Sequence, residues 1–325
     1  MFTVILFMGG YTMAKRSPDT GTGITMSLIK AIREKNKLTP EELCEGICSK
    51  SQLLKIESGI YRPPLAVLES IMQRLGEDPH QYYIGYATIE NKRVADLKKE
   101  MNSFLRERKS HEAQELLNIL EEDEGFKAKI NIQFLLYTKA VLAFYEKDYD
   151  NAHQHALKGI KLTKKKFQEN EVDNYVLTID EIRLVLQFSL IYLETGAYDK
   201  CAELLFKLKK SVDNNYFDNL ERTEIQINIL YNLTKCLGLL GRTDEWLCLC
   251  IQGIEFCVEI CNAYYLPMFM TNKAYYFFHL GKTDEGKKLI NDAFVYFACH
   301  KRTKEIEILK EGIKKRYGIE INFDI

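Results

Sequence analysis

The stretch Ile47–Gly59, ICSKSQLLKIESG, decides how the N-terminal part of this chain folds. Ser49 followed three residues later by Gln52 forms a capping box, so a helix is predicted to begin directly after Ser49. Apolar residues continue that helix, and Gly59 is predicted to end it. Its first turn carries hydroxyls, an amide and lysines, which an ordinary amphipathic helix does not require.

A second capping box lies just upstream of the first. Thr39 and Glu42 stand three residues apart, and Pro40 occupies the first helical position between them. Two short helices with caps this close together are typical of a helix-turn-helix, whose second helix enters the major groove with its first turn. A further helix is predicted over 65–75, stopped by Gly76. The residues expected to contact base edges and phosphates are Ser49, Lys50, Ser51, Gln52 and Lys55.

Charge supports a local rather than a global contact with DNA. The segment 27–75 carries a formal charge of +2, whereas the whole chain carries −1. No overall field therefore attracts nucleic acid or a membrane, and DNA binding depends on a local patch. Glu57 points away from the predicted DNA face, and Arg33 on the preceding helix is its predicted partner in a structural ion pair.

Composition favours an all-α globular protein of two or three domains. The chain has 325 residues, of which 46% are hydrophobic and 28% charged, with only 18 glycines and 6 prolines. Nine scattered cysteines without a secretion signal indicate reduced thiols in a cytosol, and those between 248 and 261 lack a zinc-binding spacing. The opening MFTVILFM is too short for a membrane span, so residues 1–25 are predicted to be a flexible tail.

The longer C-terminal part contains a recurring pattern of turns. They begin at Lys147, Gly196, Gly241 and Gly281, at spacings of 49, 45 and 40 residues, and each separates an apolar helix from an amphipathic one. Mostly small residues recur at matched places beside these turns, which allows paired helices to pack closely. They are Ala140, Ser189, Thr234 and Ala274 before the turns, and Ala152, Cys201, Trp246 and Gly286 after them. A terminal helix is predicted over 303–317.

Polar residues also recur, nine positions before each turn, in helices that are otherwise apolar. They are Thr138, Gln187, Asn232 and Asn272. Side-chain amides donate and accept hydrogen bonds at once and can pair with a peptide backbone, although polar residues on an open face can also simply be solvated. The predicted peptide-binding residues are Gln187, Asn228, Tyr231, Asn232, Lys235, Asn272 and Tyr275, with Arg183 nearby.

These motifs resemble known families. TPEEL at 39–43, the S-x-S…IESG pattern at 49–59 and PPLAVLESIMQRLG at 63–76 resemble the Xre/Cro-type helix-turn-helix family. The shortened turn resembles the peptide-responsive regulators of the Rgg/PlcR kind (the RRNPP family), and the later repeats resemble the 34-residue tetratricopeptide repeat. Pro40 departs from the pattern, because many members carry a DNA-contacting Gln there. The resemblance implies that Asn232 and Asn272 contact a peptide.

The resulting prediction is a helix-turn-helix domain followed by a tetratricopeptide-like α-solenoid. Residues 1–25 form the tail, 26–80 the Xre-type domain, 81–108 a linker helix, and 109–325 the repeat domain for peptide binding and dimerisation. The resemblance implies a cytoplasmic quorum-sensing regulator, a homodimer that binds double-stranded operator DNA and a short signalling peptide.

Two alternatives stay open. In one, the protein is a repressor whose repeats only dimerise or bind another protein. In the other, it is a peptide-controlled repeat protein that inhibits an enzyme. Neither catalytic residues, nor metal ligands, nor a cofactor, nor a membrane partner is predicted, because no nucleotide-binding, metalloprotease or Ser-His-Asp pattern occurs.

Overall fold

The computed structural model describes residues 20–77, 89–213 and 220–323, and helices are the only regular elements within these ranges. The helix-turn-helix domain contains α1 (Thr20–Lys35), α2 (Pro40–Cys44), α3 (Lys50–Glu57) and α4 (Leu65–Leu75). The repeat domain contains α5 (Ile89–Arg106), α6 (Ser110–Glu122), η2 (Glu124–Phe126), α7 (Lys129–Tyr145), α8 (Tyr149–Thr163), η3 (Glu169–Asn174), α9 (Ile179–Glu194), α10 (Tyr198–Asp213), α11 (Leu220–Leu240), α12 (Thr243–Glu259), α13 (Leu266–His279), α14 (Thr283–Cys299) and α15 (Thr303–Tyr317).

Local hydrogen bonds explain where the helices of the first domain begin. Both predicted capping boxes are present: the Thr39 hydroxyl accepts from the Glu42 amide at 3.2 Å, and the Ser49 hydroxyl accepts from the Gln52 amide at 3.1 Å. Gly76, at φ +92°, ends α4. The apolar faces of α1–α4 meet in one small core made by Ile29, Leu43, Cys44, Leu53, Ile56, Leu68, Ile71, Met72 and Leu75.

Two boundaries differ from the sequence-based expectation. The first helix begins at Thr20, so the last residues of the predicted tail 1–25 are helical, while residues 1–19 lie outside the described part of the chain. The predicted linker helix corresponds to α5, but α5 packs on α6 and α7 and places Met101 and Leu105 in a shared core. We therefore describe α5 and α6 as the first helical pair of the repeat domain.

The four predicted turns each join a pair of antiparallel helices, namely α7/α8, α9/α10, α11/α12 and α13/α14. Each turn needs one residue with positive φ. Glycine supplies it at 196, 241 and 281, whereas Lys147 adopts φ +63° in the first turn. The helix predicted over 303–317 is α15, which packs on α14.

The small residues at matched positions are buried between the paired helices, and the one large exception is accommodated. The indole of Trp246 on α12 is 2% exposed. Its ring atoms would lie 2.8 Å from a Cβ on Gly238 of α11, so a side chain at 238 would displace the indole. A glycine on one helix thus compensates for the tryptophan on its partner.

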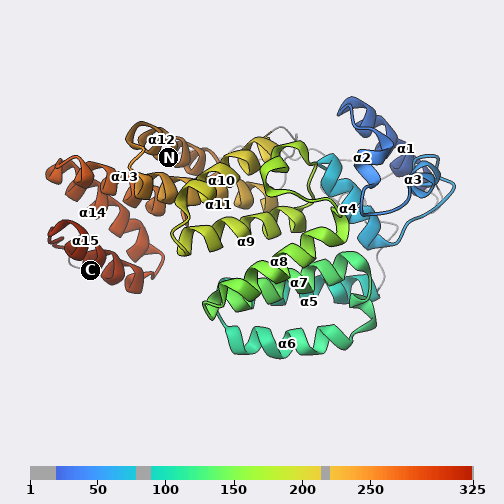
Figure 1. Cartoon of the computed structure of the whole chain (residues 1–325), viewed down its shortest axis with the longest axis horizontal. Coiled ribbons are helices and arrows are strands. Elements are labelled where there is room, and N and C mark those ends of the chain that lie inside the picture. The colour runs from blue at the N-terminus through green and yellow to red at the C-terminus, as the bar shows by residue number, and fades with distance from the viewer. Residues whose placement is uncertain (1–19, 78–88, 214–219, 324–325) are drawn as a thin grey trace, which may run out of the picture.

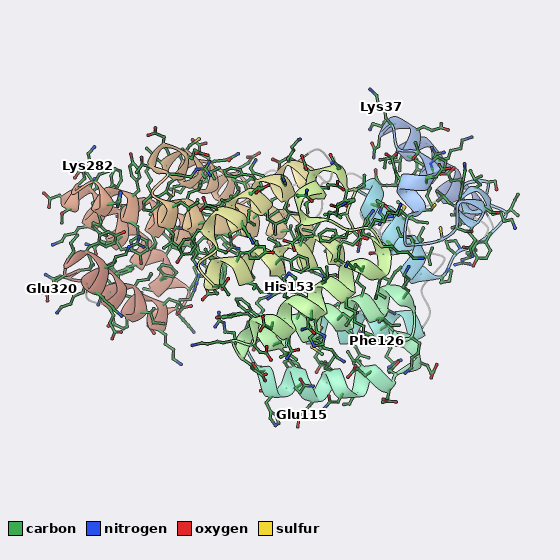
Figure 2. All side chains as sticks on the ribbon, viewed as in Figure 1. Lys37, Glu115, Phe126, His153, Lys282 and Glu320 are labelled. Carbon is green, nitrogen blue, oxygen red and sulfur yellow. The ribbon has the colours of Figure 1, made fainter. Side chains whose placement is uncertain are left out.

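The helices form an elongated molecule (Figure 1). The helix-turn-helix domain, in blue, lies at one end, and α13–α15, in orange and red, lie at the other. Figure 2 shows Lys37 at the outer tip of the first domain and Lys282 and Glu320 at the opposite end. The two functions predicted from the sequence therefore belong to different parts of one continuous helical body.

Candidate functional site

The predicted DNA-contacting side chains lie on the outer surface of α3. Leu53, Ile56 and Glu57 point into the domain and are buried, so the opposite face of α3 is turned to solvent. Its exposed residues include all of the predicted contacts, namely Ser49, Lys50, Ser51, Gln52 and Lys55. The structure therefore brings these residues together on one accessible face.

Gln52 is constrained by its role in the helix cap. Its Oε1 accepts a hydrogen bond from the Ser49 amide at 3.0 Å. A glutamine reads adenine by accepting with Oε1 and donating with Nε2 at the same time. With Oε1 engaged, the side chain keeps its Nε2 donors for acceptors such as guanine O6 or thymine O4.

The two lysines of α3 differ in how they are held. Lys50 forms an ion pair of 2.5 Å with Glu41 of α2, and this hydrogen bond lowers the pKa of the Glu41 carboxyl. Lys55 makes no ion pair with any described residue and presents its charge to solvent. Lys55 is therefore the more available phosphate contact.

Leu54 is one of the apolar residues of α3, but it does not join the core. It is 45% exposed and lies one helical turn after Ser51. The amphipathic period could have revealed this, because Leu53 and Ile56 already define the buried face. An apolar side chain thus joins the polar face of α3.

The predicted pair of Arg33 and Glu57 holds α3 against α1. Arg33 Nε donates to Glu57 Oε1 at 2.6 Å, and Nη2 donates to Oε2 at 3.0 Å. Both side chains are buried. The hydrogen bond to Glu57 raises the pKa of Arg33 above its usual value, so the guanidinium stays protonated. The predicted structural ion pair is confirmed in geometry.

In the repeat domain, the recurring residues Asn232 and Asn272 are buried and do not lie on an open, solvated face. Asn232 and Asn272 are 7% and 5% exposed, and both use their amides within the protein. Asn232 Nδ2 donates to the carbonyl of Asn228 at 2.9 Å, and Asn272 Nδ2 donates to the hydroxyl of Thr234 at 2.8 Å. The sequence predicted that these amides pair with a peptide backbone, whereas each already makes a hydrogen bond inside the repeat domain.

Gln187 is different, because its amide nitrogen is buried without a hydrogen-bond partner. An unpaired buried donor is costly, and native proteins usually satisfy such groups with protein, water or ligand atoms. Gln187 lies in the middle of α9, a first helix of a repeat. It is the one recurring polar residue whose donor remains to be satisfied.

The other predicted peptide-binding residues gather at aromatic contacts on α11 and α13. The Tyr231 ring meets Phe269 edge-on at 5.9 Å, and Lys235 Nζ lies 5.9 Å from the centre of the Tyr231 ring. Asn228 Oδ1 accepts from the Tyr265 hydroxyl at 2.8 Å. Burial raises the pKa of Tyr231 to about 12, so this phenol is a neutral donor at physiological pH.

Tyr275 extends this aromatic surface toward the C-terminal end. Its ring centre lies 6.0 Å from that of Tyr317 on α15, and burial raises its pKa to about 12. The structure therefore groups Asn228, Tyr231, Lys235 and, through α13, Tyr275 along neighbouring first helices. Gln187 and Arg183 lie on the preceding first helix, α9.

Sequence reasoning missed a cavity at the N-terminal end of this row of first helices. It measures about 180 Å³ and lies between α5, α7 and α9. Arg183 was noted from sequence, but the other lining residues were not, because α5 had been taken for a linker. They are Asn102, Leu105, Arg106, Tyr137, Val141 and Tyr145. A larger cavity of about 360 Å³ between α10, α11 and α12 contains none of the predicted residues.

The described ranges contain no group of His, Cys, Asp or Glu side chains arranged to hold a metal ion. None of the described helices combines the length and apolar composition needed to cross a bilayer. The cysteines carry free thiols.

Comparisons agree with this geometry. Residues 29–81 match the family model described as helix-turn-helix, so the N-terminal domain is a helix-turn-helix domain. No curated protein sequence matches the chain. Together the fold and the matched segment define a helix-turn-helix domain carried on an α-helical repeat domain.

Solved structures share this whole architecture. The structure of Bacillus thuringiensis PlcR in complex with the peptide PapR7 and DNA is 22% identical with a TM-score of 0.58, over 87% of this chain and 98% of PlcR. The apo form of PlcR is 19% identical with a TM-score of 0.57, over 88% of this chain and 98% of PlcR. ComR from S. thermophilus, in complex with DNA and its signalling peptide ComS, is 18% identical with a TM-score of 0.53, over 90% of this chain and 100% of ComR. This chain has the fold of these proteins across both domains.

Proposed function

We propose that this protein is a cytoplasmic transcriptional regulator that binds operator DNA as a homodimer and responds to a short signalling peptide. The observation that carries the proposal is the extent of the likeness to PlcR, which covers both domains of a protein crystallised with a peptide and DNA. The exposed, capped α3 supports DNA binding independently. No enzymatic activity is assigned.

On DNA, α3 would occupy the major groove. Gln52 donates to a base acceptor, Lys50 and Lys55 contact phosphates, and Ser49 and Ser51 contribute hydroxyls at the helix N-terminus. Leu54 offers an apolar contact suited to a thymine methyl group. One such helix contacts few bases, so two copies reading half-sites about 34–36 Å apart would supply the remaining specificity.

In the repeat domain, the peptide would lie along the first helices α7, α9, α11 and α13. A bound peptide backbone must satisfy its own N–H and C=O groups. The free donor of Gln187, the amides of Asn232 and Asn272, and the Tyr275 phenol would serve these groups. The aromatic contacts around Tyr231 would cover its apolar side chains.

One observation favours a second candidate function. The amides of Asn232 and Asn272 already bond inside the repeat domain, Asn232 within α11 and Asn272 from α13 to Thr234 of α11, as expected if the repeats serve only dimerisation or protein–protein contact. Calorimetric titration separates the two. The titrants are synthetic peptides encoded by short reading frames beside this gene, and saturable binding by one of them supports the peptide-responsive function.

DNA binding is tested by selecting duplexes from a random pool with the full chain. Lys55→Ala should weaken binding to all selected duplexes and reduce its salt dependence, because one phosphate contact is lost. The matched control is Lys282→Ala, an exposed lysine at the far end of the molecule (Figure 2). Equal affinities for the two variants would exclude α3 as the DNA-contacting helix.

A further inference from the structure

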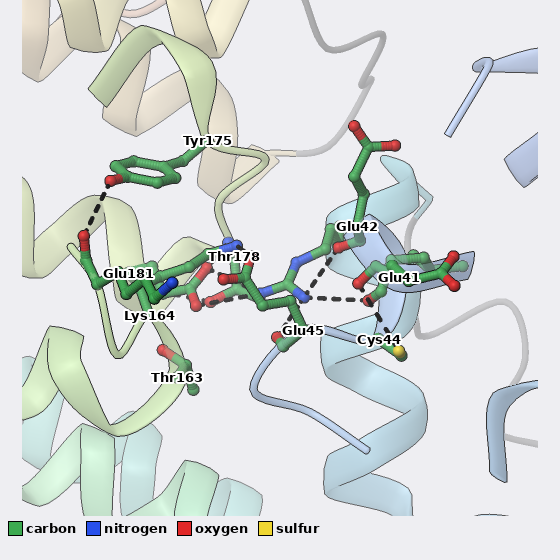
Figure 3. Close-up of polar contacts among 12 residues, drawn as sticks. Glu41, Glu42, Cys44, Glu45, Thr163, Lys164, Tyr175, Thr178 and Glu181 are labelled. Carbon is green, nitrogen blue, oxygen red and sulfur yellow. Dashed lines mark hydrogen bonds and ion pairs between the residues drawn. The ribbon is translucent and has the colours of Figure 1, made fainter. Parts of the chain in front are cut away.

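The two domains meet through a buried charge contact. The Arg74 side chain, on α4, is fully buried, and its Nη2 lies 3.1 Å from Glu181 Oε1 on α9. Its Nη1 donates to the backbone carbonyls of Leu43 and Glu45, at 3.0 and 2.6 Å, at the C-terminal end of α2. Figure 3 shows this network between the labelled Glu181 and the labelled Glu42 and Glu45. One guanidinium thus ties α2 and α4 to the repeat domain.

Glu181 also builds the first turn of α9. Its Oε2 accepts from the Thr178 amide at 2.7 Å in a capping box. In addition, Gln73 of α4 accepts a hydrogen bond from the Ile179 amide at 3.4 Å. The start of α9 is therefore defined partly by residues of the other domain.

The charges in this contact are balanced. Burial raises the pKa of Glu181, but the positive charges of Arg74 and Lys164 outweigh burial and leave that pKa below its usual value. Lys164 is itself 2% exposed, and its Nζ donates to Glu45 Oε2 at 2.7 Å. Removing one member therefore leaves an unpaired charge in the interface.

A second contact fixes the turn between α2 and α3. Gly46 has φ +72°, and a Cβ there would lie 2.2 Å from the carbonyl oxygen of Thr163 at the end of α8. Lys129 Nζ donates to the Gly46 carbonyl at 3.1 Å. The turn immediately before the DNA-contacting helix therefore rests directly on the repeat domain.

The same helix α9 borders the candidate peptide groove, which is the surface along the first helices α7, α9, α11 and α13. Arg183 lines the cavity between α5, α7 and α9, and Gln187, six residues beyond Glu181, carries the unsatisfied amide. A packed helix moves as a unit, so a displacement of α9 at the groove reaches its first turn.

We propose that Arg74 and Glu181 are a positioning pair, which together with the Gly46 contact couples α9 to the helix-turn-helix domain. This role rests on the proposed function, which supplies the two ligands, operator DNA and a short signalling peptide. It names the structural route by which occupancy of the groove changes DNA binding. Because coupling between two binding sites is reciprocal, DNA binding must alter α9 by the same route.

Reciprocity allows a test that needs no peptide. The probe is a duplex selected by the wild-type full chain, and the readout is amide hydrogen exchange of residues 179–190. We expect the duplex to change exchange in this segment of the wild-type protein by about 5- to 150-fold, the usual range of allosteric coupling. Glu181→Gln keeps the capping box, which accepts glutamine, but removes the charge that pairs with Arg74. This variant should still bind the duplex while losing the response in α9.

Matched variants separate coupling from local damage. Glu42→Gln changes the equivalent residue of an exposed capping box and should keep the response. Gly46→Ala and Gly59→Ala add the same methyl group at the same φ of +72°, but nothing lies within 4 Å of a Cβ at 59. Only Gly46→Ala should abolish the response in α9.

The outcomes are distinguishable. If the wild-type chain selects no duplex, the proposed function fails, and the positioning role falls with it. If the chain binds its duplex but amide exchange in α9 does not change, the positioning role alone is refuted. It is also refuted if Glu181→Gln and Gly46→Ala show the same change in α9 exchange as the wild-type protein. Loss of response in those two variants, with Glu42→Gln and Gly59→Ala unaffected, supports it.

Discussion

Replacing Arg33 with Ala should selectively destabilise the helix-turn-helix domain. Arg33 makes two hydrogen bonds to the Glu57 carboxylate, at 2.6 and 3.0 Å, and a third to the Leu38 carbonyl at 3.0 Å. The Arg33 and Glu57 side chains are 8% and 2% exposed. The substitution therefore leaves a buried carboxylate without a counter-charge.

The size of the effect follows from that burial. Removing one partner of a buried ion pair typically costs about 3–5 kcal/mol, which is a large part of the roughly 5–15 kcal/mol that stabilises a whole domain. At about 1.4 kcal/mol per factor of ten, amide exchange in α1–α4 should accelerate by about two to three and a half powers of ten. Exchange in α10–α15 should not change, because the bonds of Arg33 to Leu38 and Glu57 lie within the helix-turn-helix domain.

Hydrogen exchange measured by mass spectrometry is the suitable assay, because the repeat domain provides an internal reference. The double variant Arg33→Met with Glu57→Met should recover most of the lost protection, since an apolar pair of similar volume often replaces a buried ion pair without cost. Lys30→Ala, which breaks only an exposed 3.9 Å pair, should change stability by about 0.5 kcal/mol or less. An acceleration below tenfold for Arg33→Ala, or a double variant less stable than the single one, would refute the reasoning.

Three further predictions concern the two candidate sites and the interface. Gln52→Glu should keep the cap of α3, and hence the melting temperature, but remove the Nε2 donor. Discrimination at one base pair should therefore fall by about 1–3 kcal/mol, measured by competition binding to substituted duplexes. Unchanged discrimination would exclude Gln52 as a base contact. Asn232→Ala combined with Asn272→Ala should abolish peptide binding in calorimetry and leave DNA binding intact. Each lost internal hydrogen bond should lower the free energy of unfolding by about 1 kcal/mol. Normal peptide affinity would place the site elsewhere. The Glu181 carboxylate has a lowered pKa in the folded state, so its ionised form stabilises the fold fully above the usual pKa of 4.5. The difference in unfolding free energy between wild type and Glu181→Gln should therefore shrink as the pH falls below that value. A difference that grows on acidification would contradict the assignment.

Much of the local structure was determined by the sequence alone. The caps at Thr39 and Ser49, the turns at 196, 241 and 281, and the helices over 65–75 and 303–317 were all predicted from residues a few positions apart. Capping bonds and turn conformations involve neighbours in the chain, so they do not depend on distant packing.

The candidate DNA face could be predicted for the same reason. α3 has a short buried stripe, and a capped first turn must point outward once that stripe is packed. Even the pairing of Arg33 with Glu57 was accessible, because adjacent helices of one small domain limit the possible partners of a buried acid. The exposure of Leu54 follows from the same stripe, because Leu53 and Ile56 define the buried face of α3.

Only the tertiary structure decided what is buried and what is paired across the chain. Arg74 and Glu181 are 107 positions apart, and no local pattern links them. The assignment of α5 to the repeat domain and the burial of Asn272 against Thr234 likewise depend on which helices become neighbours. Helix type and helix ends depend on short-range bonds, whereas burial and charge pairing depend on the arrangement of whole helices, because the surfaces that exclude water come from remote segments.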